Sequence, residues 1–338
     1  MTNSISRQFE RALGTLCTND RIRAVEAGID HAVLWSEVDA LGFTDALVPE
    51  AQGGAGLSLG QCGPLLVAAG RAGLGHPFGE TMVARALLAR AGHDPGQDCV
   101  ALSRAAPRDD EAVVCREVPG AKLSRQVLVH WRGEWLLLPM AAVRQEPSSY
   151  RPNASATLYW ESASQASARW DATGPSAATL CNAIYAAAMA GAMERVLDLS
   201  VRYAGDRRQF GRPIAQFQAV QQDLAVLAEQ AASAAIAARI GCATDGLEPE
   251  ELPAAVAKLR ASEAALRVAS LAHAVHGAIG ITEEHVLGLF TTRLHEWRAS
   301  AGTELTCART IGGAALRSPE GFSEFMRAAL APTPLAED

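Results

Sequence analysis

Apolar residues change their spacing twice along this chain, and the changes divide it into three parts. In residues 1–97 they recur every three or four positions, the spacing of helices with one buried face. Residues 98–173 carry short apolar runs separated by Pro, Gly, Asp and Arg, which is typical of successive strands. Helical spacing then returns. The pattern predicts an α+β fold with an N-terminal helical domain (1–97), a small, shortened β-barrel domain (98–173) and a C-terminal four-helix bundle (174–338).

Small side chains dominate the predicted bundle. The segments 183–192, 219–242 and 253–275 are rich in Ala and Gly. Side chains of this size allow helix backbones to approach each other closely, so we expect tight helix packing in this part of the chain.

The composition limits the classes of protein that the chain can represent. Of its 338 residues, 49% are hydrophobic and 20% are charged, which is typical of a globular protein with a large core. The net charge is −7, and the basic residues are spread along the chain. In a general nucleic-acid binder the Lys and Arg residues cluster on one stretch or surface. The even spread in this chain therefore argues against that class.

The cysteines and the N-terminus bear on the compartment. The cysteines are odd in number and far apart, without a C-x-x-C pair, which favours free buried thiols in a reducing cytosol. Residues 1–10 are polar and lack an apolar signal core, and no apolar run approaches the length of a membrane span. We therefore expect a cytoplasmic protein with no membrane association. The seven cysteines are Cys17, Cys62, Cys99, Cys115, Cys181, Cys242 and Cys307.

The segment from Arg207 to Gln218 is a candidate anion site. Gly211 and Pro213 interrupt the helical spacing, which predicts a helix end, a turn and a new helix. Arg207 would then lie beside the start of the next helix, where unpaired N–H groups favour an anion. Spacing alone equally fits a solvated helix end whose last carbonyls the arginine neutralises.

This segment resembles the signature of the acyl-CoA dehydrogenase family of flavoproteins. It reads R-x-x-F-G-x-P-I-x-x-x-Q. In that family the arginine and phenylalanine reach across a dimer interface to the pyrophosphate end of the partner's FAD. The resemblance assigns these roles to Arg207 and Phe210, places Gln218 at the following glutamine, and implies FAD as the cofactor.

A second motif begins at His276 and reads H-G-A-I-G-I-T-E-E. Alone, it fits glycines at a helix C-cap. It is also similar to the family's Q-x-H-G-G-x-G-Y-T-x-E loop, which meets the FAD pyrophosphate from the neighbouring subunit. Gly277 and Gly280 match, whereas the second glycine is Ala278 here. His273 and His276 lie three residues apart without a third ligand nearby, so no metal site is expected.

Three further segments extend the resemblance over nearly the whole chain. Val48 to Gly56 and His76 to Thr81 are similar to motifs of the family's N-terminal domain. Ala299 to Glu304 is similar to its Tyr-Glu-Gly-Thr loop, with Gly302 and Thr303 matching; in relatives this threonine hydrogen-bonds FAD. The glycine-dense first segment alone fits a loop between helices.

The residues expected to bind the flavin ring and to take a proton are missing. The family's Thr-Glu-Pro-x-x-Gly-Ser-Asp loop is replaced by a segment in which only Ser103 is a stand-in. Removing the α-proton of an acyl thioester requires a carboxylate within about 3 Å of it. The family's two glutamate positions fall on Ala301 and Cys181, and Glu304 is a weak substitute, so no catalytic residue is predicted.

These absences resemble the short subunits of heteromeric acyl-CoA dehydrogenases, some of which act on steroid side-chain thioesters. The resemblance implies α,β-desaturation of an acyl-CoA by a complex with a full-length acyl-CoA dehydrogenase-like subunit, with electron-transfer flavoprotein as the electron acceptor. Two alternatives stay open: a non-catalytic scaffold of the same fold that binds no flavin, and a flavin-dependent hydroxylase, which needs no thioester base.

Overall fold

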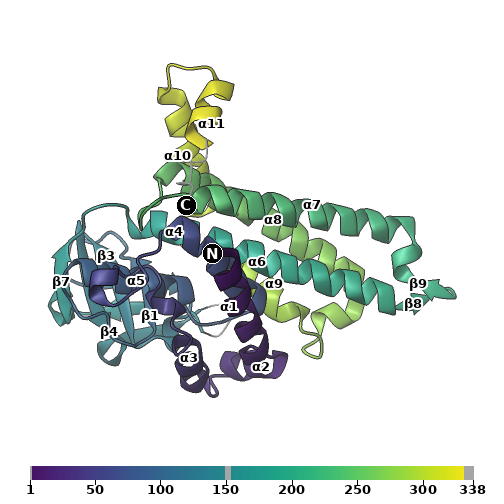
Figure 1. Ribbon diagram of the computed structural model, residues 1–338, viewed down its shortest axis with the longest axis horizontal. Helices are drawn as coiled ribbons and strands as arrows, with labels where there is room; N and C mark the ends of the chain where they lie inside the picture. Colours follow the sequence, from purple (N-terminus) through teal and green to yellow (C-terminus); the bar gives the residue numbers. More distant parts are fainter. Residues whose placement is uncertain (1, 149–153, 331–338) are drawn as a thin grey trace.

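Two groups of helices and a β-domain make up the computed structural model, which describes residues 2–148 and 154–330 (Figure 1). The first group contains α1 (Thr2–Leu16), α2 (Asn19–Glu26), α3 (His31–Asp39), α4 (Leu59–Ala72) and α5 (Phe78–Arg90). The strands are β1 (Val100–Arg104), β2 (Val113–Val118), β3 (Gln126–Trp131), β4 (Glu134–Pro139), β5 (Arg144–Pro147), β6 (Ala156–Trp160) and β7 (Ala168–Asp171). The last group contains α6 (Ala177–Asp206), α7 (Gln218–Cys242), α8 (Glu251–His276), α9 (Leu287–Ala299), α10 (Glu304–Arg317) and α11 (Phe322–Leu330), with a small hairpin, β8 (Arg208–Gln209) and β9 (Arg212–Pro213), between α6 and α7. The α+β class predicted from the sequence is confirmed.

Helix α5 lies at the centre of the N-terminal group. All its residues from Phe78 to Ala89 are buried, because neighbouring elements cover every side of the helix. Phe9 of α1 stacks on Phe78 with 5.0 Å between ring centroids. The hydroxyl of Thr81 donates to the Val100 carbonyl at 3.1 Å and accepts from the Val100 amide at 3.0 Å, which ties α5 to the first strand.

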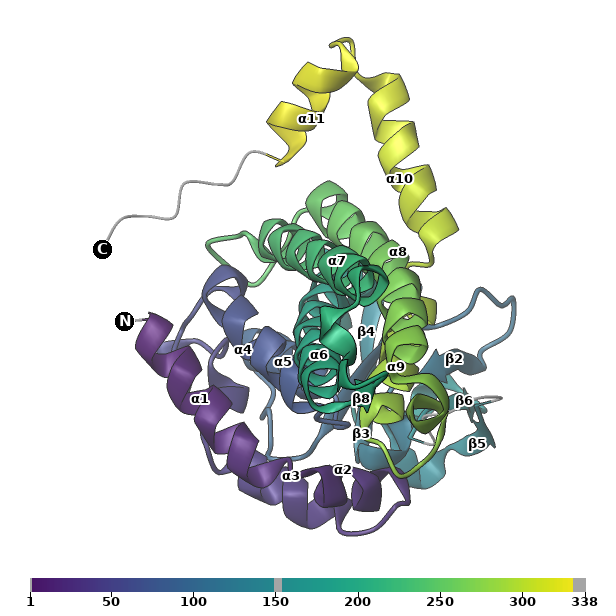
Figure 2. The same ribbon diagram turned by 90° about the vertical axis from the view of Figure 1, so that its right-hand side faces the viewer.

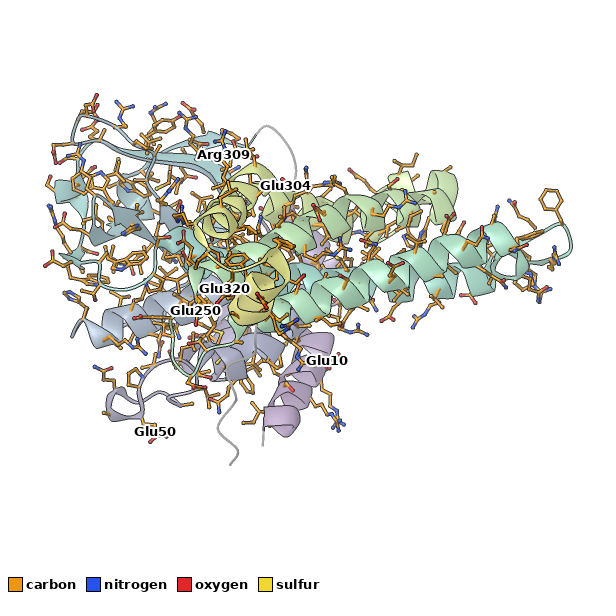
Figure 3. The ribbon with its side chains drawn as sticks, turned by 90° about the horizontal axis from the view of Figure 1, so that it is seen from above. Glu10, Glu50, Glu250, Glu304, Arg309 and Glu320 are labelled. Atoms are coloured by element: carbon orange, nitrogen blue, oxygen red, sulfur yellow. The ribbon has the colours of Figure 1, made fainter. Side chains whose placement is uncertain are left out.

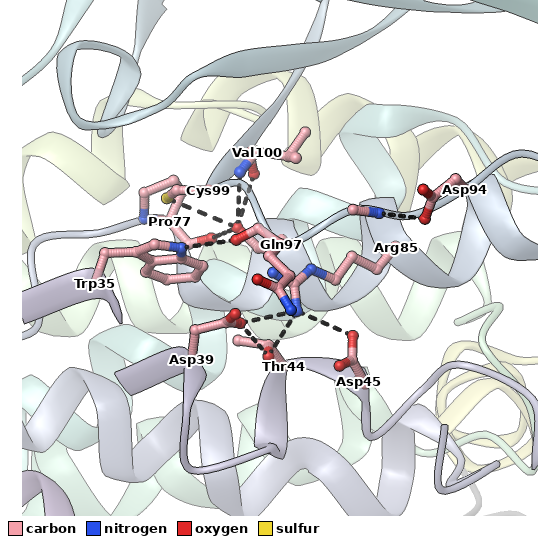
Figure 4. Close-up of polar contacts among 12 residues, drawn as sticks. Trp35, Asp39, Thr44, Asp45, Pro77, Arg85, Asp94, Gln97, Cys99 and Val100 are labelled. Carbon is pink, nitrogen blue, oxygen red and sulfur yellow. Dashed lines mark hydrogen bonds and ion pairs between the residues drawn. The ribbon is translucent and has the colours of Figure 1, made fainter. Parts of the chain in front are cut away.

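A buried arginine fixes α5 to the preceding helices. Arg85 is 1% exposed, and its guanidinium contacts Asp39 at 2.8 Å, Asp45 at 3.0 Å and the Thr44 hydroxyl at 2.9 Å (Figure 4). A buried charge is tolerated only when paired and hydrogen-bonded, and these three contacts, all made by Nη1, offset part of the cost of burying Arg85.

The β-domain is a sandwich of two separate sheets, and not the barrel predicted for residues 98–173. One sheet has the order β1-β3-β4-β7, with β1 and β3 parallel, and the other has the order β2-β6-β5. Alternate residues of the first sheet face opposite ways. On β3, Val127 and Val129 pack between the sheets, whereas Leu128 joins the main core with the helices. The first sheet is therefore covered on both faces.

Glycines allow the closest helix crossing. A Cβ at Gly70 of α4 would collide with the Ala188 carbonyl of α6, and a Cβ at Gly191 of α6 would collide with the Val67 carbonyl of α4. Each helix thus presents its glycine where the other backbone comes nearest. The tight packing that the small residues predicted is present at this crossing.

Helices α6, α7, α8 and α9 form the bundle, and α10 and α11 project from it as a helical arm (Figure 2). Two segments, Gln218–Cys242 and Glu251–Ile281, are long and apolar enough by length and composition to cross a membrane. The expectation that no apolar run approaches this length was therefore wrong. Inside the protein, 33% of the apolar window of the first segment and 50% of that of the second are buried.

All seven cysteines are buried and unpaired. This agrees with the free buried thiols expected from their wide spacing. The compartment of the protein stays a prediction.

Candidate functional site

The segment from Arg207 to Gln218 forms a β-hairpin and a short 3-10 turn between α6 and α7. Helix α6 ends at Asp206, as predicted, but α7 begins only at Gln218, because Pro213 precedes the 3-10 turn η6 (Ile214–Gln216). The helix end, turn and new helix expected from the sequence are all present, but the turn is extended into a hairpin that the sequence did not indicate. The Ile214 amide donates to the Arg207 carbonyl at 2.8 Å and closes the base of the hairpin.

The hairpin presents its side chains to solvent. Phe210 is 91% exposed and has a φ of 49°, which a bulky residue rarely adopts. Gly211 follows with a φ of 80° and completes the turn. Among the described residues, neither Arg207 nor Arg208 forms an ion pair, and both are exposed. An exposed ring at a strained tip, flanked by unpaired cations, has the character of a contact surface for another molecule.

The second glycine motif lies close to the base of this hairpin. Gly277 caps α8 with a φ of 62° and a ψ of −142°, which strongly favours glycine, and the 3-10 turn η7 (Gly277–Ile281) follows. His276, just before it, stacks on Tyr203 of α6 with 4.5 Å between centroids. We call the surface formed by Arg207, Phe210, Gln218, Gly277 and Gly280 the hairpin site.

Burial keeps His276 neutral. Its Nδ1–H donates to the Ala272 carbonyl at 2.8 Å, and its Nε2 has no partner among the described residues. Desolvation lowers the pKa of His276 below its usual value, and the neighbouring His285 acts in the same direction. His276 therefore packs as an apolar ring that fixes the start of η7.

A cavity of about 510 Å³ lies between the β-domain and the bundle. We call it the interdomain pocket. Its walls come from the ends of β1 and β2, the first turns of α6 and the residues after α9. The lining residues are Leu102, Ser103, Arg104, Ala105, Ala106, Pro107, Arg116, Glu117, Val118, Pro119, Ala177, Ala178, Cys181, Tyr185, Ala299, Ser300 and Ala301.

Ala301 and Cys181, the two positions that carry a glutamate in relatives, both line this pocket. Alanine has no proton acceptor. Burial raises the pKa of the Cys181 thiol far above its usual value, so the thiol stays protonated, and its Sγ donates to the Leu102 carbonyl at 3.8 Å. Glu304 pairs with Arg298 and is not among the lining residues. The structure thus brings Ala301 and Cys181, the two positions selected by the family resemblance, to the wall of one pocket.

The sequence reasoning missed one carboxylate in the pocket wall. Glu117 lies in a bulge between Cys115 and Val118 and has a φ of 47°. Its carboxylate accepts hydrogen bonds from the Ser148 hydroxyl at 2.5 Å and the Thr157 hydroxyl at 3.4 Å. No sequence pattern marks a bulge in so short a strand, so the only available signal was a charged pair, Arg116 and Glu117, inside an otherwise apolar run.

The hairpin site and the interdomain pocket lie at opposite ends of α6. Cys181 is in the second turn of this helix, whereas Arg207 follows its last residue. At the rise of an α-helix the two are roughly 40 Å apart. Thr303, at the start of α10, is on the pocket side, and Figure 3 shows neighbouring Glu304 far from the hairpin end of the bundle. The predicted site residues of one chain therefore do not form one site.

Comparisons with known proteins agree with this architecture. Residues 182–331 match the family described as acyl-CoA dehydrogenase, C-terminal domain. The acyl-CoA dehydrogenase IpdE2 of Mycolicibacterium smegmatis is 44% identical over 112 residues, which are 33% of this chain and 35% of that protein. The match thus spans about a third of that relative's length.

Solved structures extend the similarity over nearly the whole chain. A chain of the ChsE4-ChsE5 complex from Mycobacterium tuberculosis superimposes with a TM-score of 0.76 at 20% identity, covering 94% of this chain and 98% of that one. The Tcur3481-Tcur3483 steroid ACAD gives a TM-score of 0.77 at 23% identity, covering 92% of this chain and 96% of that one.

The architecture is therefore the acyl-CoA dehydrogenase fold, in which a β-domain lies between an N-terminal helical domain and a helical bundle. More specifically, residues 182–331 match an acyl-CoA dehydrogenase C-terminal domain, which agrees with the family resemblance of the motifs in this region.

Proposed function

We propose that this chain is a subunit of an FAD-dependent acyl-CoA dehydrogenase that introduces an α,β double bond into an acyl-CoA thioester. In this proposal its hairpin site completes an FAD site seated mainly on a full-length partner subunit. The observation that carries the proposal is the strained, 91% exposed Phe210 beside unpaired arginines, about 40 Å along α6 from the chain's own pocket.

The hairpin site has donors that suit a dinucleotide pyrophosphate. Arg207 and Arg208 are exposed cations without ion pairs among the described residues. A guanidinium group can bind a phosphate through two parallel N–H···O hydrogen bonds. Gly277 is exposed, whereas Gly280 is buried, and a Cβ at Gly280 would lie 2.9 Å from the His276 Cβ. These residues would hold the phosphates, and Phe210 would pack against the cofactor or the partner.

The interdomain pocket suits the flavin ring poorly. Ser103 is the one hydroxyl donor from the segment that in relatives contacts the ring, and the wall positions Arg104 and Arg116 are charged. The FAD supplies a hydride acceptor when bound, and the α-proton needs a carboxylate. Because Ala301 and Cys181 offer none, we infer that the partner supplies the proton acceptor.

The descriptions of two structural neighbours support a proposal for the substrate class. One neighbour is described as a steroid ACAD and another as a two-protein complex. We propose a bulky acyl thioester, such as one with a steroid side chain, and a heteromeric assembly.

The proposal is tested by co-expressing the chain with a candidate full-length acyl-CoA dehydrogenase-like partner from the same organism. Flavin absorbance and desaturation are measured on the complex and on each chain alone. We expect Arg207→Ala to lower the FAD affinity of the complex about ten- to a hundred-fold, the scale of one charge-assisted contact. Arg239→Ala, which removes an exposed arginine near the other end of α7, serves as the control. A lone chain that carries full FAD and desaturates the thioester would overturn the proposal.

A further inference from the structure

A lysine with no exposed surface lies inside the bundle. Lys258 of α8 is 0% exposed, and its Nζ donates to the Gly302 carbonyl at 2.9 Å, the Arg298 carbonyl at 3.0 Å and the Ser262 hydroxyl at 3.3 Å. An ammonium group has three N–H donors, and all three find acceptors. Two of these acceptors are backbone carbonyls on either side of Ala301: that of Arg298 in the last turn of α9, and that of Gly302 in the segment that connects α9 to α10.

A second side chain holds the same segment from α6. The Asn182 Oδ1 accepts from the Gly302 amide at 3.0 Å. A Cβ at Gly302 would lie 2.6 Å from that oxygen and 2.8 Å from the Cys307 sulfur, so only glycine fits. Both backbone polar groups of Gly302 are thus held by buried side chains of neighbouring helices. We call residues 300–303 the α9–α10 loop.

The loop needs this support because its backbone is strained. Ala301 has a φ of 57°, and a left-handed conformation costs a non-glycine residue about 1–3 kcal/mol. Such a conformation persists where surrounding contacts outweigh the cost. Ala301 lines the interdomain pocket, and Thr303 caps α10 by accepting from the Thr306 amide at 3.4 Å. The strained residue therefore sets both a pocket wall and the start of a helix.

We propose that Lys258 is a positioning residue: its buried ammonium holds the α9–α10 loop so that Ala301 forms the pocket wall and Thr303 caps α10. This proposal rests on the contacts of Lys258 and does not depend on the proposed function.

The buried surroundings of Lys258 disfavour its charged form and so lower its pKa. Burial lowers the pKa of Lys258 to about 8, opposed by Cys307 and Glu304 of α10. Arg298 of α9 lowers the pKa further, whereas Cys181 of α6 raises it. A neutral amine has two N–H donors for three acceptors, so the hold on the loop weakens as the pH rises through about 8.

The test measures amide hydrogen exchange of the α9–α10 loop in the full-length chain. We expect Lys258→Met to speed exchange of the Gly302 amide about ten- to a hundred-fold relative to its intrinsic rate, as for loss of charge-assisted hydrogen bonds. Protection of this amide should fall through about pH 8 in the unmodified chain and lose that dependence in the variant. Arg260→Met, which removes a cation that contacts Ser233 on α7, is the matched control and should leave the loop unchanged.

The same variants are then assembled with the partner subunit, and FAD affinity is measured by flavin fluorescence. If the unmodified complex binds no FAD, the proposed function fails, and the exchange result still decides the role of Lys258. Should Lys258→Met not fold, Lys258→Gln, which retains two donors but reaches less far, takes its place. Unchanged exchange at Gly302 in the folded variant would overturn the proposal.

Discussion

At the scale of single residues, the chemistry of the interdomain pocket depends on which wall residues carry a carboxylate. Ala301 and Cys181 carry no carboxylate, while Glu117 of the β-domain does. Its strained backbone and two hydroxyl donors fix that carboxylate at the pocket wall. Strained residues cluster at functional sites. A substitution of Glu117 is therefore the most direct test of whether this chain supplies a base.

We predict that Glu117→Gln leaves desaturation by the assembled complex within about twofold, because the partner supplies the proton acceptor and glutamine retains the acceptor oxygen for Ser148. The measurement is kcat and KM of the complex across pH. A base contributes about a hundred-fold or more to such a step. A loss of that size, with a changed pH profile, would assign the base to this chain.

Sequence reasoning identified several important residues but could not place them. Counting from motifs selected Ala301 and Cys181, which the structure brings to one pocket. It could not find that Arg207 and Thr303 lie at opposite ends of the bundle, because spacing along a chain does not give helix direction. Lys258 gave no signal either, since a lone lysine in an alanine-rich helix is ordinarily exposed.

At the scale of elements, helical spacing correctly marked the long bundle helices, whereas the two-residue strands β8 and β9 were not foreseen. Strands this short have no alternation to detect. The helix α5 is buried on all sides and has no polar face, so its central position also depends on contacts that only the tertiary structure provides.

The crossing of α4 and α6 gives a prediction for stability. Gly191→Ala places a methyl group against the Val67 carbonyl, and the backbone of α4 has to shift. We expect a loss of about 1–3 kcal/mol in the free energy of unfolding, the usual cost of overpacking. Gly312→Ala in α10 is the control, because nothing lies within 4 Å of its added Cβ and alanine favours helix. Denaturant unfolding measures the stability of both variants. If Gly191→Ala were as stable as the original chain, α4 and α6 would not be closely packed there.

At the scale of the whole molecule, a buried polar network joins the three parts of the chain. Arg293 of α9 contacts Glu26 of α2 and, at 2.8 Å, Glu296, which accepts from Ser155 near the start of β6. Glu80 of α5 lies beside this group and lines a small cavity of about 20 Å³ with Arg293. The relative placement of the domains thus depends on groups whose charge is expensive to bury.

The protonation of Glu80 gives the network a pH dependence. Burial raises the pKa of Glu80 from 4.5 to about 7, opposed by its hydrogen bond with Tyr185. The folded chain therefore binds a proton at this site more readily than the unfolded chain does. Its contribution to stability is complete below about pH 4.5 and is lost as the pH rises through about 7.

We predict that Glu80→Gln removes this dependence. The difference in unfolding free energy between the variant and the original chain should move in favour of the variant by about 3 kcal/mol between pH 4.5 and pH 8. Denaturant unfolding at several pH values measures it, and Glu50→Gln, at an exposed glutamate labelled in Figure 3, is the control. Because His76 and other buried groups titrate in both chains, only the difference isolates Glu80. A pH-independent difference would mean that Glu80 stays ionised, held by Arg293 strongly enough to offset its burial.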